Sequence, residues 1–182
     1  QRRKAQGLQV ADVNMHMIFT GNPGTGKTTI ARILSKYLKA IGALRGGQLV
    51  EVTRADLVGR YVGHTAPLTN QVIQSALGGV LFIDEAYSLY RGGEDSFGLE
   101  AIDTLVKGIE DHRDDLVVIL AGYSKEMALF LTANSGLASR FPNQIEFPDY
   151  TGAELLAITQ SIAKSKGYRL DDACAMPLVA FF

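Results

Sequence analysis

Residues 16–28 read HMIFTGNPGTGKT, an apolar run followed at once by a glycine-rich loop. The loop, residues 21–28, satisfies the pattern G-x-x-x-x-G-K-[ST] and stands between an apolar strand and a helix-forming segment, the context that this phosphate-binding motif requires. In such a loop the glycines let backbone N–H groups curl around phosphate oxygens, and the helix N-terminus favours their negative charge. The four fixed positions should arise by chance in about one such chain in a hundred or fewer. The sequence therefore predicts a P-loop that binds nucleotide.

The residues of this loop have distinct expected roles. Lys27 is expected to reach the β and γ phosphates of ATP, and the Thr28 hydroxyl is expected to ligate Mg²⁺. Thr29 has a plainer interpretation as a surface or packing residue of the helix. With ATP and Mg²⁺ as the predicted cofactors, the expected nucleotide contacts are Gly21, Asn22, Pro23, Gly24, Thr25, Gly26, Lys27, Thr28, Thr29 and Asp84.

Residues 80–85 read VLFIDE, four apolar residues followed by two acids. A fully apolar strand is buried in a parallel sheet, and it delivers the acids at the carboxyl edge, where open α/β sheets bind ligands. Asp84 is expected to hold Mg²⁺, mostly through water, and Glu85 to activate the attacking water as general base. The alternative is that the two acids only cap the helix that follows. Together with the P-loop they predict an ATP hydrolase.

Apolar runs of strand length alternate with segments of helical periodicity along the chain. This alternation is typical of βαβ units and of a parallel sheet covered on both faces. The sequence therefore predicts an α/β fold, a doubly wound P-loop NTPase with a parallel five-stranded sheet. The expected strands are residues 16–20, 49–53, 80–84, 116–121 and 144–147, and the expected helices are residues 27–41, 68–76, 99–112 and 125–133.

A second, helical unit is predicted after Pro148. Thr151 and Glu154 form a capping box ahead of an amphipathic segment that runs to about residue 166, and Asp171 or Asp172 is expected to cap a further helix. We expect residues 1–149 to form a large nucleotide-binding subdomain and residues 150–182 to form the truncated beginning of a small α-helical one. Because the chain opens without methionine and stops within an apolar run, we also expect sequence beyond both ends.

Composition and charge argue against several classes of protein. The formal net charge of −1 provides no field that would hold a polyanion, so no nucleic acid is expected as a partner. No apolar run approaches the roughly 20 residues that span a bilayer, so no membrane insertion is expected. The single Cys174 fits a reducing compartment, the cytoplasm or an organelle matrix or stroma. His16, His64 and His112 lack metal-ligand spacing and are interpreted as structural.

Three further stretches distinguish between families of P-loop proteins better than the P-loop itself does. Residues 52–67 read VTRADLVGRYVGHTAP, residues 78–87 read GGVLFIDEAY, and residues 113–123 read RDDLVVILAGY. With the P-loop, they make nearly the whole chain resemble AAA+ ATPases of the CbbX/CfxQ type. That group includes red-type Rubisco activases, stage V sporulation protein K and type VII secretion ATPases. The resemblance implies a homo-oligomeric ring, a hexamer, that acts on a protein client, and it makes the second unit the start of an AAA+ lid.

The resemblance also assigns residues outside the P-loop. It places Tyr61, Val62 and Gly63 in a pore loop, where an aromatic ring can grip many polypeptide sequences. The alternative is a turn tyrosine that packs at the base of its loop. Residues 91–98 correspond to a second pore-facing loop, or to a plain surface loop.

Arg140 corresponds to the arginine finger, which would reach the γ phosphate bound by a neighbouring subunit and stabilise charge in the transition state. An ordinary surface salt bridge is the alternative for this residue. The sensor position at the end of the fourth strand falls on Tyr123 or Ser124 in place of the more common asparagine. With Lys27 and Glu85, whose expected roles follow from their own motifs, Arg140 makes up the expected catalytic residues.

Three functions are considered from these residues. The leading one is an ATP-driven machine that threads or tugs a client polypeptide through the pore of a ring, with Rubisco as a candidate client. The second is a nucleotide-dependent assembly scaffold or switch with slow hydrolysis, which would not need to retain Glu85. The third, a nucleic-acid motor, is disfavoured by the net charge and by the aromatic pore loop. The shared motifs do not identify the client.

Overall fold

The structure is a computed structural model that describes residues 14–181. The backbone contacts divide the chain into two units between Phe147 and Pro148. The larger unit contains the sheet, and the smaller unit is helical. The identity of the second unit as the start of a lid stays a prediction.

The larger unit is built on a sheet of five parallel strands in the order β2-β3-β4-β1-β5. The predicted fold class and strand number are therefore confirmed. Each predicted strand differs from the observed one by a single residue at one or both ends, because the ladder of backbone hydrogen bonds sets the ends and an apolar pattern does not report it. The carboxyl ends of β3, β4 and β1 adjoin at one edge. The strands are β1 (Met17–Thr20), β2 (Leu49–Val52), β3 (Val80–Ile83), β4 (Val117–Gly122) and β5 (Asn143–Glu146).

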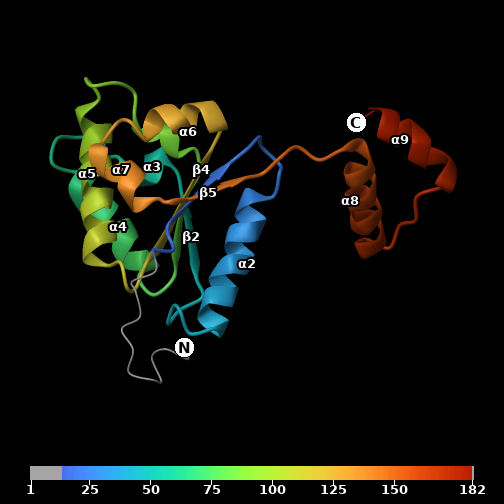
Figure 1. Ribbon diagram of the computed structural model, residues 1–182, viewed down its shortest axis with the longest axis horizontal. Coiled ribbons are helices and arrows are strands. Elements are labelled where there is room, and N and C mark those ends of the chain that lie inside the picture. The colour runs from blue at the N-terminus through green and yellow to red at the C-terminus, as the bar shows by residue number, and fades with distance from the viewer. Residues whose placement is uncertain (1–13, 182) are drawn as a thin grey trace. The chain divides into compact units, whose positions relative to one another are not determined.

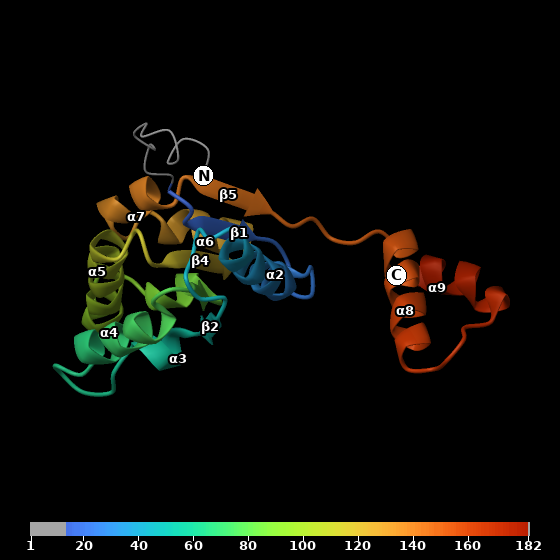
Figure 2. The same ribbon diagram turned by 90° about the horizontal axis from the view of Figure 1, so that it is seen from below.

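Strand side chains alternate between two cores, one on each face of the sheet. Phe19 and Phe82 pack on the face covered by α2 (Lys27–Ala40), with Ala31 and Leu38 of that helix. The other core combines strand residues with residues of α4 (Thr65–Ala76) and α5 (Ser96–Asp111). Figures 1 and 2 show α2 on the opposite side of the sheet from α4 and α5. Residues of the second core include Ile18, Leu81, Ile83, Val118, Leu120, Ile73, Ile102 and Leu105.

Three of the predicted helices begin earlier than the apolar pattern indicates. α4 includes Pro67 in its first turn, where proline is tolerated. α5 starts at Ser96 because the Asp95 side chain accepts a capping hydrogen bond from the Gly98 N–H. α6 (Ser124–Phe130) begins one residue earlier than predicted, with only Tyr123 between it and β4, and ends three residues before the predicted end.

Three short elements were not predicted at all. They are α3 (Arg54–Leu57), the 3-10 helix η1 (Ala86–Leu89) and α7 (Ser135–Arg140). Each has fewer than two turns, so hydrophobic periodicity cannot reveal it. α3 and α7 are stabilised by caps instead: a Thr53–Asp56 capping box and the Asn134 side chain.

The smaller unit contains α8 (Gly152–Ser165), the 3-10 helix η2 (Asp172–Cys174) and α9 (Ala175–Phe181). The predicted capping box of Thr151 and Glu154 is present, and Asp171, one of the two predicted caps, accepts from the Ala173 N–H. No residue of these three elements is buried. Throughout residues 14–181, no helix combines the length and the apolar character needed to cross a membrane.

Candidate active site

The loop between β1 and α2 has a backbone that only glycine adopts without strain. Gly21 has φ of 144°, and a Cβ there would overlap the carbonyl oxygen of Phe147, which follows β5. Gly26 has φ of 94° and occupies the N-cap position of α2. The Gly21 N–H donates to the Gly122 carbonyl at 3.2 Å, so the loop is attached to the end of β4. The P-loop therefore lies where β1, β4 and β5 end.

Lys27 is turned back onto this loop. Its Nζ donates to the carbonyl oxygens of Gly21 at 2.8 Å and Asn22 at 2.7 Å. Partial burial lowers the pKa of Lys27, and the nearby carboxylate of Asp84 opposes that shift. Thr25 is buried and donates its hydroxyl to the Asn22 carbonyl at 2.8 Å. The ammonium group is thus fixed at the mouth of the loop, within electrostatic reach of Asp84.

The end of β3 carries the two acids. The Asp84 N–H donates to the Val52 carbonyl at 2.9 Å, and Asp84 Oδ1 accepts from the Glu85 N–H at 2.9 Å. Glu85 has φ of 47° and ψ of 46°, and it is the one non-glycine residue with positive φ in the described part of the chain. Consecutive residues of a strand point to opposite faces, but this left-handed turn lets both side chains reach the same cavity.

The alternative interpretation of these acids as helix caps does not fit the geometry of the turn. Glu85 occupies the N-cap position of η1, but its side chain accepts no capping hydrogen bond. Its carboxylate is exposed. A strained backbone that presents an exposed carboxylate is typical of a functional position.

A cavity of about 350 Å³ joins the P-loop to the acids. Ten of the predicted residues line it, including Thr29 and the sensor candidate Tyr123. Asn22, Thr25 and Ser124 do not line it: Thr25 points into the loop, and Ser124 opens α6. The complete lining is Gly21, Pro23, Gly24, Gly26, Lys27, Thr28, Thr29, Asp84, Glu85, Tyr87, Gly122 and Tyr123.

Tyr87 and Gly122 line the cavity but were not predicted. The rings of Tyr87 and Tyr123 lie 5.9 Å apart between centroids, at 34° to each other. Burial raises the pKa of Tyr87, and the charge of Glu85 adds to the shift. Tyr87 is the second residue of η1, the 3-10 helix that follows Glu85 directly. The sequence did not predict η1, so it could not predict that Tyr87 lines the cavity.

The lining suits a magnesium nucleotide. The Thr28 hydroxyl and the Asp84 carboxylate are oxygen ligands that face one cavity, and Mg²⁺ in phosphate sites takes one or two protein ligands, with water and phosphate oxygens completing the shell. Residues 14–181 contain no cluster of three or more His, Cys, Asp or Glu that could hold a metal without such help. The cavity also falls within the usual range of about 300–1,000 Å³ for ligand sites.

Arg140 and the Tyr61 loop lie outside this cavity. Arg140, at the end of α7, donates to the Gly136 carbonyl at 3.1 Å and pairs with Glu110 at 3.5 Å. Its Nε–H is buried and has no hydrogen-bond partner among the described residues. The structure thus contains the salt bridge that the alternative interpretation expects, and the arginine-finger role stays a prediction.

Tyr61 lies between α3 and α4 and is 68% exposed. Its ring meets His64 edge-on, with centroids 5.5 Å apart. Val62 is 87% exposed, and Gly63 has φ of 81°. This exposure does not fit a tyrosine packed at the base of a loop. In the second predicted loop, residues 96–98 belong to α5, so only residues 91–95 remain as a connection.

A parallel α/β sheet with a P-loop, a basic residue and two acids around one cavity defines a P-loop ATPase domain. The chain belongs to the family described as ATPase family associated with various cellular activities (AAA), which matches residues 17–149. A crystal structure of the FIGL-1 AAA domain in complex with ADP shares the fold, with a TM-score of 0.63 and 20% identity. That match covers 90% of this chain and 53% of the FIGL-1 chain.

Curated relatives match at about half identity. Stage V sporulation protein K of Bacillus subtilis is 54% identical over 170 residues, which cover 93% of this chain and 53% of the relative. The chloroplastic ribulose bisphosphate carboxylase/oxygenase activase of Cyanidioschyzon merolae is 52% identical over 92% of this chain and 58% of the relative. Protein CfxQ of Xanthobacter flavus is 52% identical over 91% and 53%. The predicted resemblance is confirmed, and the chain spans little more than half the length of these relatives.

Proposed function

We propose that the protein uses ATP hydrolysis at this cavity to remodel a protein client. The observation that carries the proposal is that Lys27, Thr28, Asp84 and Glu85 line one cavity at the carboxyl edge of the sheet. In this proposal Lys27 binds the β and γ phosphates, Thr28 and Asp84 hold Mg²⁺, and Glu85 accepts the proton of the attacking water. Bound Mg²⁺ would neutralise charge that develops on the phosphates.

The proposed hydrolytic site is completed by a neighbouring subunit. Arg140 lies outside its own cavity, and a cation at the γ phosphate stabilises the transition state. A head-to-tail arrangement in which each subunit supplies Arg140 to the next closes into a ring. We infer a hexamer because the resemblance to CbbX/CfxQ proteins implies one.

The proposed contact with the client is Tyr61. Its ring and the Val62 side chain are both exposed on one loop of the same unit. An exposed aromatic ring can press on an extended polypeptide without requiring a particular sequence. Red-type Rubisco is the first client to test, because the Cyanidioschyzon merolae relative is named a carboxylase/oxygenase activase. The relative named for sporulation is just as similar, so the client is tested separately from the motor.

The test compares Tyr61→Ala with Tyr37→Ala in the intact protein. Tyr37 is a matched control because it is 59% exposed but lies on α2. We expect Tyr61→Ala to keep hydrolysing ATP and to lose reactivation of inhibited red-type Rubisco, whereas Tyr37→Ala keeps both. If Tyr61→Ala reactivates Rubisco as well as the parent, the threading role of Tyr61 is wrong. If the parent hydrolyses ATP but leaves Rubisco inhibited, the client is another protein.

A further inference from the structure

A largely buried ion pair lies outside the nucleotide cavity. Arg54 of α3 and Asp95, the N-cap of α5, form a two-pronged ion pair, with Nη1–Oδ2 at 2.6 Å and Nη2–Oδ1 at 3.1 Å. Their side chains are only 17% and 14% exposed. The Arg54 guanidinium holds the pKa of Asp95 below its usual value. Because each charge is partly desolvated, removal of one partner leaves the other uncompensated.

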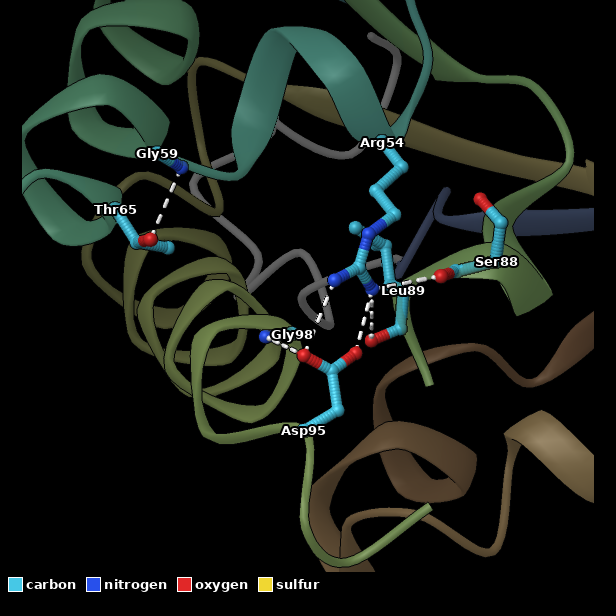
Figure 3. Close-up of polar contacts among 7 residues, drawn as sticks. All are labelled: Arg54, Gly59, Thr65, Ser88, Leu89, Asp95 and Gly98. Atoms are coloured by element: carbon cyan, nitrogen blue, oxygen red, sulfur yellow. Dashed lines mark hydrogen bonds and ion pairs between the residues drawn. The ribbon is translucent and has the colours of Figure 1, made fainter. Parts of the chain in front are cut away.

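The pair holds three separate segments together (Figure 3). The Arg54 guanidinium also donates to the carbonyl oxygens of Ser88 at 2.9 Å and Leu89 at 3.4 Å, both in η1. Asp95 Oδ1 accepts from the Gly98 N–H at 3.1 Å in α5. Gly98 has no room for a side chain, because a Cβ there would overlap Asp95 and the Leu89 carbonyl. α3, η1 and the start of α5 are therefore fixed to one another by one guanidinium group.

One of these segments continues from the proposed catalytic base. η1 follows Glu85 directly, and the Ser88 N–H donates to the Glu85 carbonyl at 2.9 Å. Ser88 thus links the two: its carbonyl accepts from the Arg54 side chain, and its N–H donates to the backbone of Glu85. A displacement of the Glu85 turn would move the carbonyl groups that Arg54 binds.

Another of these segments leads to the Tyr61 loop. α3 ends at Leu57, whose carbonyl accepts from the Thr69 hydroxyl at 2.8 Å. The loop is closed by a hydrogen bond from the Gly59 N–H to the Thr65 hydroxyl at 3.0 Å, also shown in Figure 3. Thr65 and Thr69 are both fully buried. Hydrogen bonds thus hold both ends of the loop, and the loop follows directly from α3.

We propose that Arg54, through its pair with Asp95, is a positioning residue that couples the Glu85 turn to the Tyr61 loop. This inference rests on the proposed function, in which those two segments bind nucleotide and client. It assigns to Arg54 the task of making the loop respond to the nucleotide in the cavity. Arginine is suited to it because its planar fork binds a carboxylate and two carbonyl groups at once.

The chain contains a matched control for this pair. Arg45 and Asp115 form a two-pronged ion pair with both distances at 2.8 Å, and their side chains are 69% and 36% exposed. Arg45 lies between α2 and β2, and Asp115 precedes β4, and the two hydrogen bonds of this pair involve neither η1 nor α3. Loss of this pair removes an ion pair of the same two-pronged geometry, though a more exposed one, without touching the proposed connection.

The experiment places a fluorescent label on the Tyr61 loop of the intact protein. Val62→Cys is labelled with an environment-sensitive dye after Cys174, the single cysteine of the sequence, is replaced by alanine. The dye signal is recorded with ADP and with a slowly hydrolysed ATP analogue, and nucleotide affinity is measured in parallel with a fluorescent analogue. The variants are Arg54→Gln, Asp95→Asn, Arg54→Lys and Arg45→Gln, each checked for folding by circular dichroism.

We expect the labelled parent and Arg45→Gln to distinguish the two nucleotides, and Arg54→Gln and Asp95→Asn to lose that difference while still binding both. Arg54→Lys should restore part of the response, because lysine keeps the charge but not the fork. This variant also serves as the test if Arg54→Gln does not fold. A full response in Arg54→Gln or Asp95→Asn, an equal loss in Arg45→Gln, or a parent that shows no difference would overturn the proposal. None of these outcomes depends on a client. A failure of the Tyr61 assay with Rubisco can therefore be distinguished from a failure of this proposal.

Discussion

Acidification should destabilise the larger unit through His16. Its Nδ1 accepts a hydrogen bond from the Val118 N–H of β4 at 2.9 Å, so the imidazole must be neutral in the folded state. The ring is 4% exposed and packs on Phe141, with centroids 5.8 Å apart. Burial lowers the pKa of His16 from 6.5 to about 4. The sequence-based interpretation of His16 as structural agrees with this placement.

The sign and size of the effect follow from that pKa. Between pH 6.5 and about 4 the unfolded chain binds a proton at His16 that the folded chain does not. The stability contributed by the neutral ring is therefore complete above pH 6.5 and is lost as the pH falls toward 4. A shift of this size corresponds to about 3 kcal/mol in the free energy of unfolding, at about 1.4 kcal/mol per pKa unit.

The matched variant is His16→Asn, whose side-chain oxygen can accept from Val118 without titrating near neutral pH. Urea unfolding followed by circular dichroism between about pH 7.5 and 4 gives the free energy of unfolding of both proteins. We expect His16→Asn to be slightly less stable near neutral pH and to lose about 3 kcal/mol less than the parent on acidification. Carboxylates such as Asp95 titrate in both proteins, so the difference isolates His16. Parallel pH profiles would refute the reasoning.

Two further predictions concern the backbone of the nucleotide cavity. Gly21→Ala should destabilise the larger unit by about 2 kcal/mol or more and weaken binding of a fluorescent ATP analogue, because the added Cβ would overlap the Phe147 carbonyl at a strained φ. Gly24→Ala should cost only about 1 kcal/mol, because a Cβ at Gly24 meets nothing within 4 Å. Equal effects of the two alanines in thermal unfolding would contradict this difference. Glu85→Gly should be more stable than Glu85→Gln by about 1 kcal/mol, since both lack the carboxylate but only glycine relaxes at φ of 47°. A glutamine variant of equal or greater stability would show that the turn is unstrained.

The sequence predicted the elements whose signals extend over many residues. The apolar run of β3 and the glycines of the P-loop each impose a local backbone that tertiary contacts do not override, so the sheet and most of the cavity were predictable. α3, η1 and α7 were not, because elements of four to six residues carry no periodic signal. α3 and α7 depend instead on local caps such as Thr53. Tyr87 was missed because its position in the cavity depends on η1.

The Arg54–Asp95 pair was unpredictable for a related reason. The partners are 41 residues apart, and nothing in the sequence shows that β2 and β3 lie side by side and bring the segments that follow them together. For Arg140, by contrast, the sequence predicts a role that the structure of a single chain does not test. A family resemblance assigns it a role toward a neighbouring subunit, while the single chain places it beside Glu110.

The most direct test of the central claim is complementation between two inactive variants. In the shared-site account, Glu85→Gln lacks the base and Arg140→Ala lacks the cation that it would donate to its neighbour, so neither should hydrolyse ATP at any protein concentration. When the two are mixed in equal amounts, about a quarter of the contacts in a head-to-tail ring pair an intact Glu85 with an intact Arg140. We predict that the mixture recovers about a quarter of the parent's turnover. No recovery, or full activity of Arg140→Ala alone, would contradict a hydrolytic site shared between subunits.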